Sequence, residues 1–99
     1  MEHGELALLR TLMDKDFYDS NKGIHTPDKL FTKDARKIKQ TIDYAMNQFD
    51  SNLNFSELEG LFFTRETLTT ANKDSYKRLF DKLREERPMN QEVAQEVMS

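Results

Sequence analysis

Residues 33–49, with the sequence KDARKIKQTIDYAMNQF, carry the clearest periodic pattern in this chain. Most of their apolar positions follow one another at intervals of three or four residues, which is the spacing of one helix face. The apolar side chains of this face are Ala35, Ile38, Ile42, Ala45, Met46 and Phe49. Most basic side chains fall outside this stripe, so the pattern predicts an amphipathic helix that packs one face against a core.

The rest of the chain also favours helices. Glycine and proline are scarce, and neither Asn-Gly nor Asp-Gly, the strongest hairpin signals, occurs. We expect a compact all-α domain of about five to six helices that covers residues 1–99 as a single unit. Its globular part should be residues 1–70 and its end an αα-hairpin of residues 71–99. Beside residues 33–49, the expected helices cover about residues 5–13, 56–63, 73–86 and 90–98.

Short signals mark the expected helix ends. Thr26 followed by Pro27 is typical of an N-cap with proline at the first helical position, and Leu30 and Phe31 should then pack inward. Ser56 and Glu59 have the spacing of a capping box. Asn90 is expected to cap the last helix. Residues 14–23 are polar and are predicted to form a loop with room for one helical turn.

Composition limits the classes of function. The net charge is −3 and the chain has no cysteine, which excludes disulfides and thiolate metal sites. The short apolar runs cannot supply the roughly 20 residues of a membrane span, and no signal peptide is visible, so we expect a cytoplasmic protein. Only 36% of the residues are hydrophobic. Such a thin core would gain stability from a partner or a second copy of the chain.

The residues that commonly carry chemistry are few. The two histidines, His3 and His25, stand alone in the sequence, and no glycine-rich phosphate loop is present. The acidic group that begins at Asp14 does not match a calcium loop, since the sixth position is Asp19 and the twelfth is His25. We therefore expect no catalytic residue, no cofactor and no metal in this domain.

Two kinds of surface are candidates for binding. Arg36, Lys37 and Lys39 are weak nucleic-acid candidates, although such runs are usually solvated helix faces. Phe62 and Phe63 follow Leu61, and three consecutive apolar residues cannot all face one core, so they either fill a corner of the core or form a partner patch. The expected closing hairpin offers the candidate self-association residues Tyr76, Leu79, Phe80, Leu83, Val93 and Val97.

The order of these elements resembles that of a known family. The first features that carry the resemblance are an opening helix with the sequence ELALL at residues 5–9, the segment DKDFY at residues 14–18, and Leu30-Phe31. The long helix, the short helix of residues 56–63 and the hairpin then follow. Together they resemble the N-terminal domain of hexameric replicative DNA helicases of the DnaB type, especially the branch of T-even-like phages. Ala35-Arg36 stands where the family often has a histidine-arginine pair, which makes this chain divergent.

The resemblance implies a function in DNA replication. In that family this domain is a non-catalytic collar that associates into dimers or trimers of dimers and helps to dock primase or a helicase loader. Any DNA contact would be weak or indirect. The ATP-dependent motor domain would lie beyond Ser99, so we expect the chain to be a fragment of a longer phage protein. The alternatives are a free-standing helical phage adaptor that binds another protein and a small DNA-binding protein.

Overall fold

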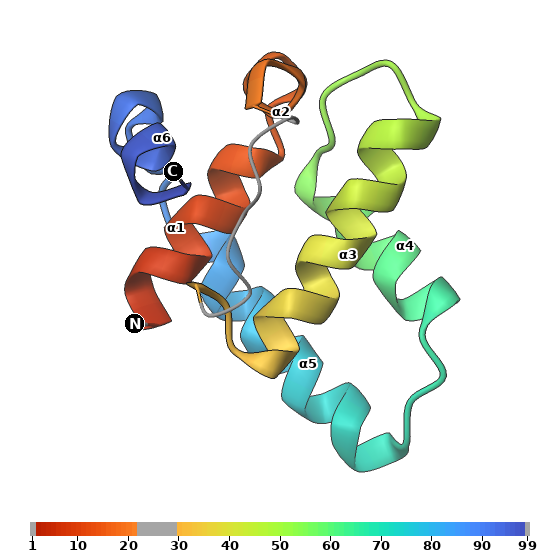
Figure 1. Ribbon diagram of the computed structural model, residues 1–99. Coiled ribbons are helices and arrows are strands. Elements are labelled where there is room, and N and C mark those ends of the chain that lie inside the picture. The colour runs from red at the N-terminus through yellow and green to blue at the C-terminus, as the bar shows by residue number, and fades with distance from the viewer. Residues whose placement is uncertain (1, 22–29, 99) are drawn as a thin grey trace.

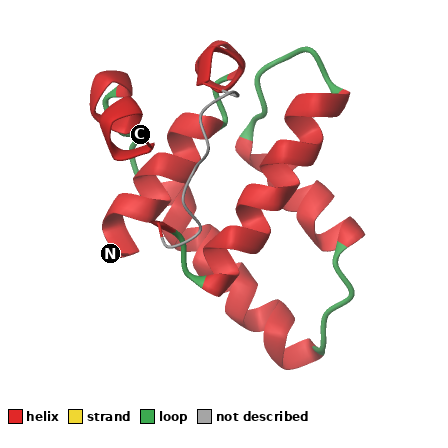
Figure 2. Ribbon diagram, viewed as in Figure 1, coloured by secondary structure: helices red, strands yellow, loops and turns green. Residues whose placement is uncertain are grey.

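The computed structural model describes residues 2–21 and 30–98 (Figure 1). The prediction of an all-α fold is confirmed, because six helices and no strand lie in these two segments (Figure 2). The helices are α1 (Glu2–Leu12), α2 (Lys15–Asn21), α3 (Lys33–Gln48), α4 (Phe55–Arg65), α5 (Thr70–Glu85) and α6 (Gln91–Met98). The cap predicted at Thr26 and Pro27 lies outside the described residues, as does His25.

Helix α1 is the centre of the fold. It packs against α2, α3, α5 and α6, while α3 and α5 also pack against α4. The sequence explains part of this position, because the leucines of α1 form a broad apolar face that needs more than one neighbouring helix to cover it. Its four leucines, Leu6, Leu8, Leu9 and Leu12, are all buried.

Helix α3 confirms most of the predicted stripe. Ala35, Ile38, Ile42, Ala45 and Met46 are buried, but Phe49 is 50% exposed. The helix ends at Gln48, and Phe49 takes an extended conformation as its C-cap. The backbone therefore leaves the helical path just where the periodicity would have turned Phe49 inward.

The acidic segment after α1 differs from the expected loop. It forms α2, whose start is capped by Asp14, since the Asp14 Oδ1 accepts a hydrogen bond from the Phe17 N–H at 3.0 Å. Lys15 and Asp19 form an ion pair one turn apart at 3.5 Å. Phe17 is buried, so this short helix is held by its cap, by its ion pair and by one apolar anchor.

The start of α4 also differs from the prediction. The capping box consists of Asn54 and Glu57 rather than Ser56 and Glu59, and the helix begins at Phe55. The Asn54 Oδ1 accepts from the Glu57 N–H at 2.8 Å, and the Glu57 Oε1 accepts from the Asn54 N–H at 3.0 Å. The earlier start lets Phe55 pack edge-on against Phe80, with ring centroids 5.7 Å apart.

The last two helices do not form a separate hairpin. The predicted cap is present, because the Asn90 Oδ1 accepts from the N–H groups of Glu92 and Val93. However, the main contacts of α5 are with α1 and α4, and those of α6 are with α1. The linker between α5 and α6, residues 86–90, is also bound to α1, since the Met89 N–H donates to the Thr11 hydroxyl at 2.7 Å. Residues 70–98 therefore complete the globule rather than protrude from it.

Candidate interaction surfaces

The aromatic residues of α4 and α5 form one cluster inside the molecule. The Phe62 ring lies 4.8 Å from Tyr76 and 5.2 Å from Phe80, and Phe63 lies 5.6 Å from Phe80, all between centroids. Phe62 is fully buried and Phe63 is partly buried against the core. The structure thus favours the core-corner interpretation, and it corrects the assignment of Phe62 to an exposed partner patch.

The candidate self-association residues divide into two groups. Tyr76, Phe80 and Leu83 are buried within the chain, because α5 turns this face toward α1 and α4. They are not available to a second copy in this structure, which corrects that part of the prediction. Leu79 and Val97 are partly buried and Val93 is 50% exposed. Any self-association surface on these helices would therefore consist of Leu79, Val93 and Val97.

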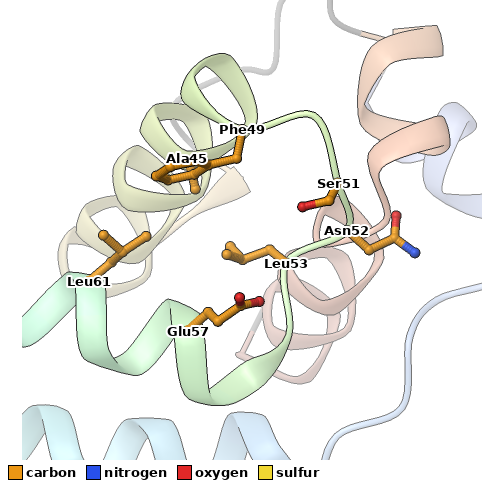
Figure 3. Close-up of a pocket in the computed structure, with 7 residues that line it drawn as sticks. All are labelled: Ala45, Phe49, Ser51, Asn52, Leu53, Glu57 and Leu61. Carbon is orange, nitrogen blue, oxygen red and sulfur yellow. The ribbon is translucent and has the colours of Figure 1, made fainter.

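A surface pocket that the sequence analysis missed lies between α3 and α4 (Figure 3). Its volume is about 330 Å³, and the last turn of α3, the following loop and the first half of α4 form its walls. Figure 3 shows the side chains of Phe49, Leu53 and Leu61 around one space, with Glu57 at its edge. The complete lining is Ala45, Phe49, Ser51, Asn52, Leu53, Glu57 and Leu61.

The basic candidates on α3 are largely engaged with neighbouring groups. Lys37 forms an ion pair with Glu66 at 3.6 Å, and Lys39 forms one with Asp43 at 3.0 Å. The Arg36 guanidinium donates to the Phe31 carbonyl at 3.3 Å. These contacts support the interpretation of the run as a solvated helix face. Arg36, which is exposed, has the most accessible charge of the three.

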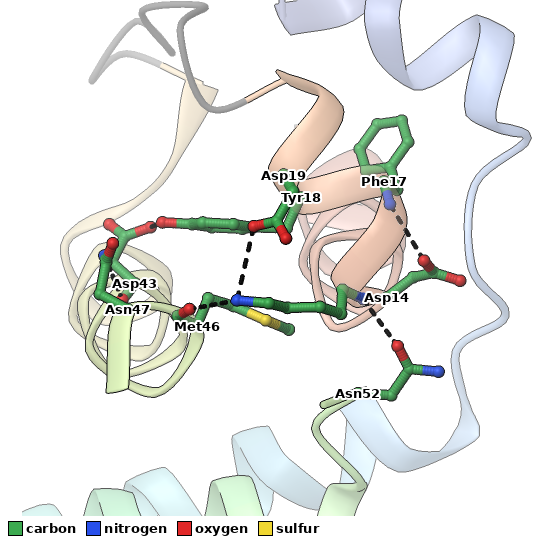
Figure 4. Close-up of polar contacts among 9 residues, drawn as sticks. Asp14, Phe17, Tyr18, Asp19, Asp43, Met46, Asn47 and Asn52 are labelled. Atoms are coloured by element: carbon green, nitrogen blue, oxygen red, sulfur yellow. Dashed lines mark hydrogen bonds and ion pairs between the residues drawn. The ribbon is translucent and has the colours of Figure 1, made fainter. Parts of the chain in front are cut away.

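Polar contacts fasten α2 to the end of α3 (Figure 4). The Lys15 ammonium donates to the Met46 carbonyl near the carboxyl end of α3, where a positive charge is favourable. The Tyr18 hydroxyl donates to Asp43 at 2.6 Å, and the Lys15 N–H donates to Asn52 at 2.8 Å. This network also holds the loop that forms one wall of the pocket.

The pKa values of two tyrosines, Tyr18 and Tyr76, are strongly raised. Burial, and then the hydrogen bond to Asp43, raise the pKa of Tyr18 well above its ordinary value. In the same way, burial and the 2.9 Å hydrogen bond to Asp34 raise the pKa of Tyr76. Raised values make both phenols weaker acids, so these groups act as hydrogen-bond donors that join α2 and α5 to α3.

The side chains that the structure describes form no cluster suited to a metal ion. Within residues 4–21 and 30–98, no group of three or more His, Asp or Glu side chains could hold such an ion. The acidic side chains near Asp14 serve the local structure instead, as the cap and ion pair of α2. In the same residues, no helix combines the length and apolar character that crossing a bilayer requires. Among the described residues, the exposed large apolar side chains are Phe49 in the pocket and Val93 on α6.

Comparisons of the chain with models of protein families, with curated proteins and with solved structures gave no match. The resemblance to DnaB-type helicases therefore rests on the order and spacing of the helices in the sequence.

Proposed function

We propose that this chain is a non-catalytic interaction domain, and specifically the N-terminal collar of a DnaB-type replicative DNA helicase. The observation that supports an interaction domain is the open apolar pocket between α3 and α4, where the Phe49 side chain is exposed. Exposed apolar concavities of this kind usually mark binding surfaces.

The collar role is supported by the order of the elements. The described residues form an apolar opening helix, a short acidic-aromatic helix, a long amphipathic helix and three further helices. This order agrees with the resemblance except at its end, where the last two helices pack into the globule instead of forming a separate hairpin. In such a protein, ATP hydrolysis and translocation belong to a separate motor domain, and this domain contributes assembly and docking of primase or a loader.

The test is to read the coding frame beyond Ser99 and to confirm the mass of the intact product. A continuation that carries a Gly-x-x-x-x-Gly-Lys-[Ser/Thr] loop, which binds nucleotide phosphates, would support the collar. A stop codon directly after Ser99 would contradict it and would favour a free-standing helical adaptor, for which the same pocket would be the binding surface.

A further inference from the structure

The pocket between α3 and α4 has apolar walls and one acidic residue, Glu57, in its lining. Phe49, Leu53 and Leu61 supply apolar walls, whereas Glu57 lines the edge and the exposed Asp50 lies in the same loop.

These acidic groups are not neutralised by cations of the described residues. Glu57 accepts a hydrogen bond from the Asn54 N–H, and within residues 2–21 and 30–98 neither Asp50 nor Glu57 forms an ion pair. Lys15 is occupied by Asp19 and the Met46 carbonyl. The Arg65 guanidinium lies over the Tyr44 ring, 3.6 Å from its centroid, and does not line the pocket.

We propose that this pocket binds a segment of another protein that presents a bulky apolar side chain beside a lysine or arginine. The apolar side chain fills the space between Phe49, Leu53 and Leu61, and the cation lies against Asp50 and Glu57. The pocket volume of about 330 Å³ is at the small end of ligand sites, which suits side chains rather than a whole helix.

Charge favours this occupant over a second copy of the chain. A symmetric dimer through this face would bring the same patch of both copies together, and thus the carboxylates of one copy near those of the other. Like charges that face each other oppose association. The proposal deepens the proposed function, since it names the chemistry of the partner that the interaction domain would recognise.

The test begins with a random peptide display library selected on the immobilised chain. The best-enriched peptide is then synthesised with a fluorescent label, together with a counterpart in which every Lys and Arg is changed to Glu. We expect enriched sequences to place Leu, Ile, Met or Phe next to Lys or Arg. The acidic counterpart should bind at least about tenfold more weakly, because it places like charges together.

Variants of the chain locate the binding site. Phe49→Ala should weaken binding of the selected peptide by about tenfold, as expected for a central apolar contact. The double change Asp50→Asn and Glu57→Gln should weaken it by about threefold and reduce its dependence on salt. Glutamine keeps the acceptor that the capping box needs, so the second variant removes charge without removing the cap.

Matched controls come from α5 and α6, which do not line the pocket. Val93→Ala changes a side chain that is as exposed as Phe49, and Asp74→Asn removes an exposed charge from α5. Both controls should bind the peptide like the wild type. Circular dichroism establishes that each variant keeps its helices.

Three results would overturn the proposal. They are a selection that enriches no peptide, an enriched set without basic residues, and binding that Phe49→Ala and the charge-removing variant leave unchanged. None of these results bears on the collar assignment, which the coding frame beyond Ser99 decides separately.

Discussion

The hydroxyl group of Thr11 joins two parts of the chain that are far apart in sequence. It accepts from the Met89 N–H at 2.7 Å and lies 2.9 Å from the Ala7 carbonyl, to which it donates. Thr11 is 2% exposed, so a methyl group in place of the hydroxyl would leave buried polar groups without their best partner.

Thr11→Val should therefore lower the free energy of unfolding by about 1–3 kcal/mol, although valine has nearly the same shape as threonine. Thr64→Val, on the exposed face of α4, is the matched control and should stay within about 0.5 kcal/mol of the wild type. Urea unfolding followed by circular dichroism measures both. Equal stability of the two variants would mean that the Thr11 hydroxyl does not hold the linker.

Phe49 shows at the level of one residue what the sequence can and cannot predict. Its spacing from Ala45 and Met46 predicted that it would continue the buried stripe of the helix, whereas the structure places it beyond the last helical residue, Gln48. Apolar periodicity does not show at which residue a helix ends. Here α3 ends at Gln48, and the chain that follows leaves the Phe49 ring half exposed. The pocket was missed for the same reason, because its walls come from segments whose packing is tertiary. The available signal was a pair of apolar residues, Phe49 and Leu53, on either side of a polar turn.

At the scale of the helix, α4 could begin at either of two capping boxes that are shifted by two residues along the chain. The sequence contains both Asn54 with Glu57 and Ser56 with Glu59, and local chemistry alone permits either. The structure uses the first pair, since a start at Phe55 lets that ring join the aromatic cluster with Phe80. The choice is therefore made by packing between α4 and α5.

This choice predicts unequal effects of two similar substitutions. Asn54→Ala should lower the free energy of unfolding by about 1 kcal/mol, because the Glu57 N–H loses its acceptor. Ser56→Ala should change it by less than about 0.5 kcal/mol, since Ser56 is an exposed residue within the first turn. Chemical denaturation measures both. A larger loss for Ser56→Ala than for Asn54→Ala would mean that Ser56 and Glu59 form the capping box of this helix.

Apolar spacing predicts some of the other helices and misses one. The long helix, the opening helix and the last helix follow from apolar spacing and from Asn90, and they are present near the expected bounds. Helix α2 was expected as a loop because its sequence is polar. Its stability comes from the Asp14 cap, the ion pair of Lys15 with Asp19 and the burial of Phe17. A prediction from apolar spacing alone does not include these contacts.

At the scale of the whole molecule, two tyrosines link other helices to α3. Tyr18 of α2 donates to Asp43, and Tyr76 of α5 donates to Asp34. The pKa of each phenol is raised by burial and by its carboxylate partner. A group whose pKa is higher in the folded state stabilises the fold fully below its unfolded pKa, which is about 10 for tyrosine, and loses this effect at higher pH.

The stability of the chain should therefore fall as the pH rises above about 10. The double variant Tyr18→Phe and Tyr76→Phe should be less stable at pH 8, by about 1 kcal/mol for each lost hydrogen bond, but should lose less of its stability at alkaline pH. Urea unfolding at a series of pH values measures this difference. Parallel losses in the wild type and the double variant would mean that these phenols do not contribute to alkaline unfolding.

The proposed collar role also predicts that the molecule associates with itself, and α6 offers the most accessible surface. Val93 and Val97 are one turn apart and lie on one side of the helix, while Ala94 and Met98 face α1. Val93→Asp should shift the chain toward the monomer in sedimentation velocity runs at increasing concentration. It should do so with little effect on folding, because half of this side chain is already in water.

Leu79→Asp also tests this surface, but Leu79 packs partly against the core, so part of its effect would be loss of stability. Phe49→Ala is the matched control, since it removes an equally exposed apolar side chain from the pocket and should leave association unchanged. A Val93→Asp variant that sediments like an oligomeric wild type would place the interface elsewhere. A wild type that stays monomeric at every concentration would remove self-association from the proposed role of this domain.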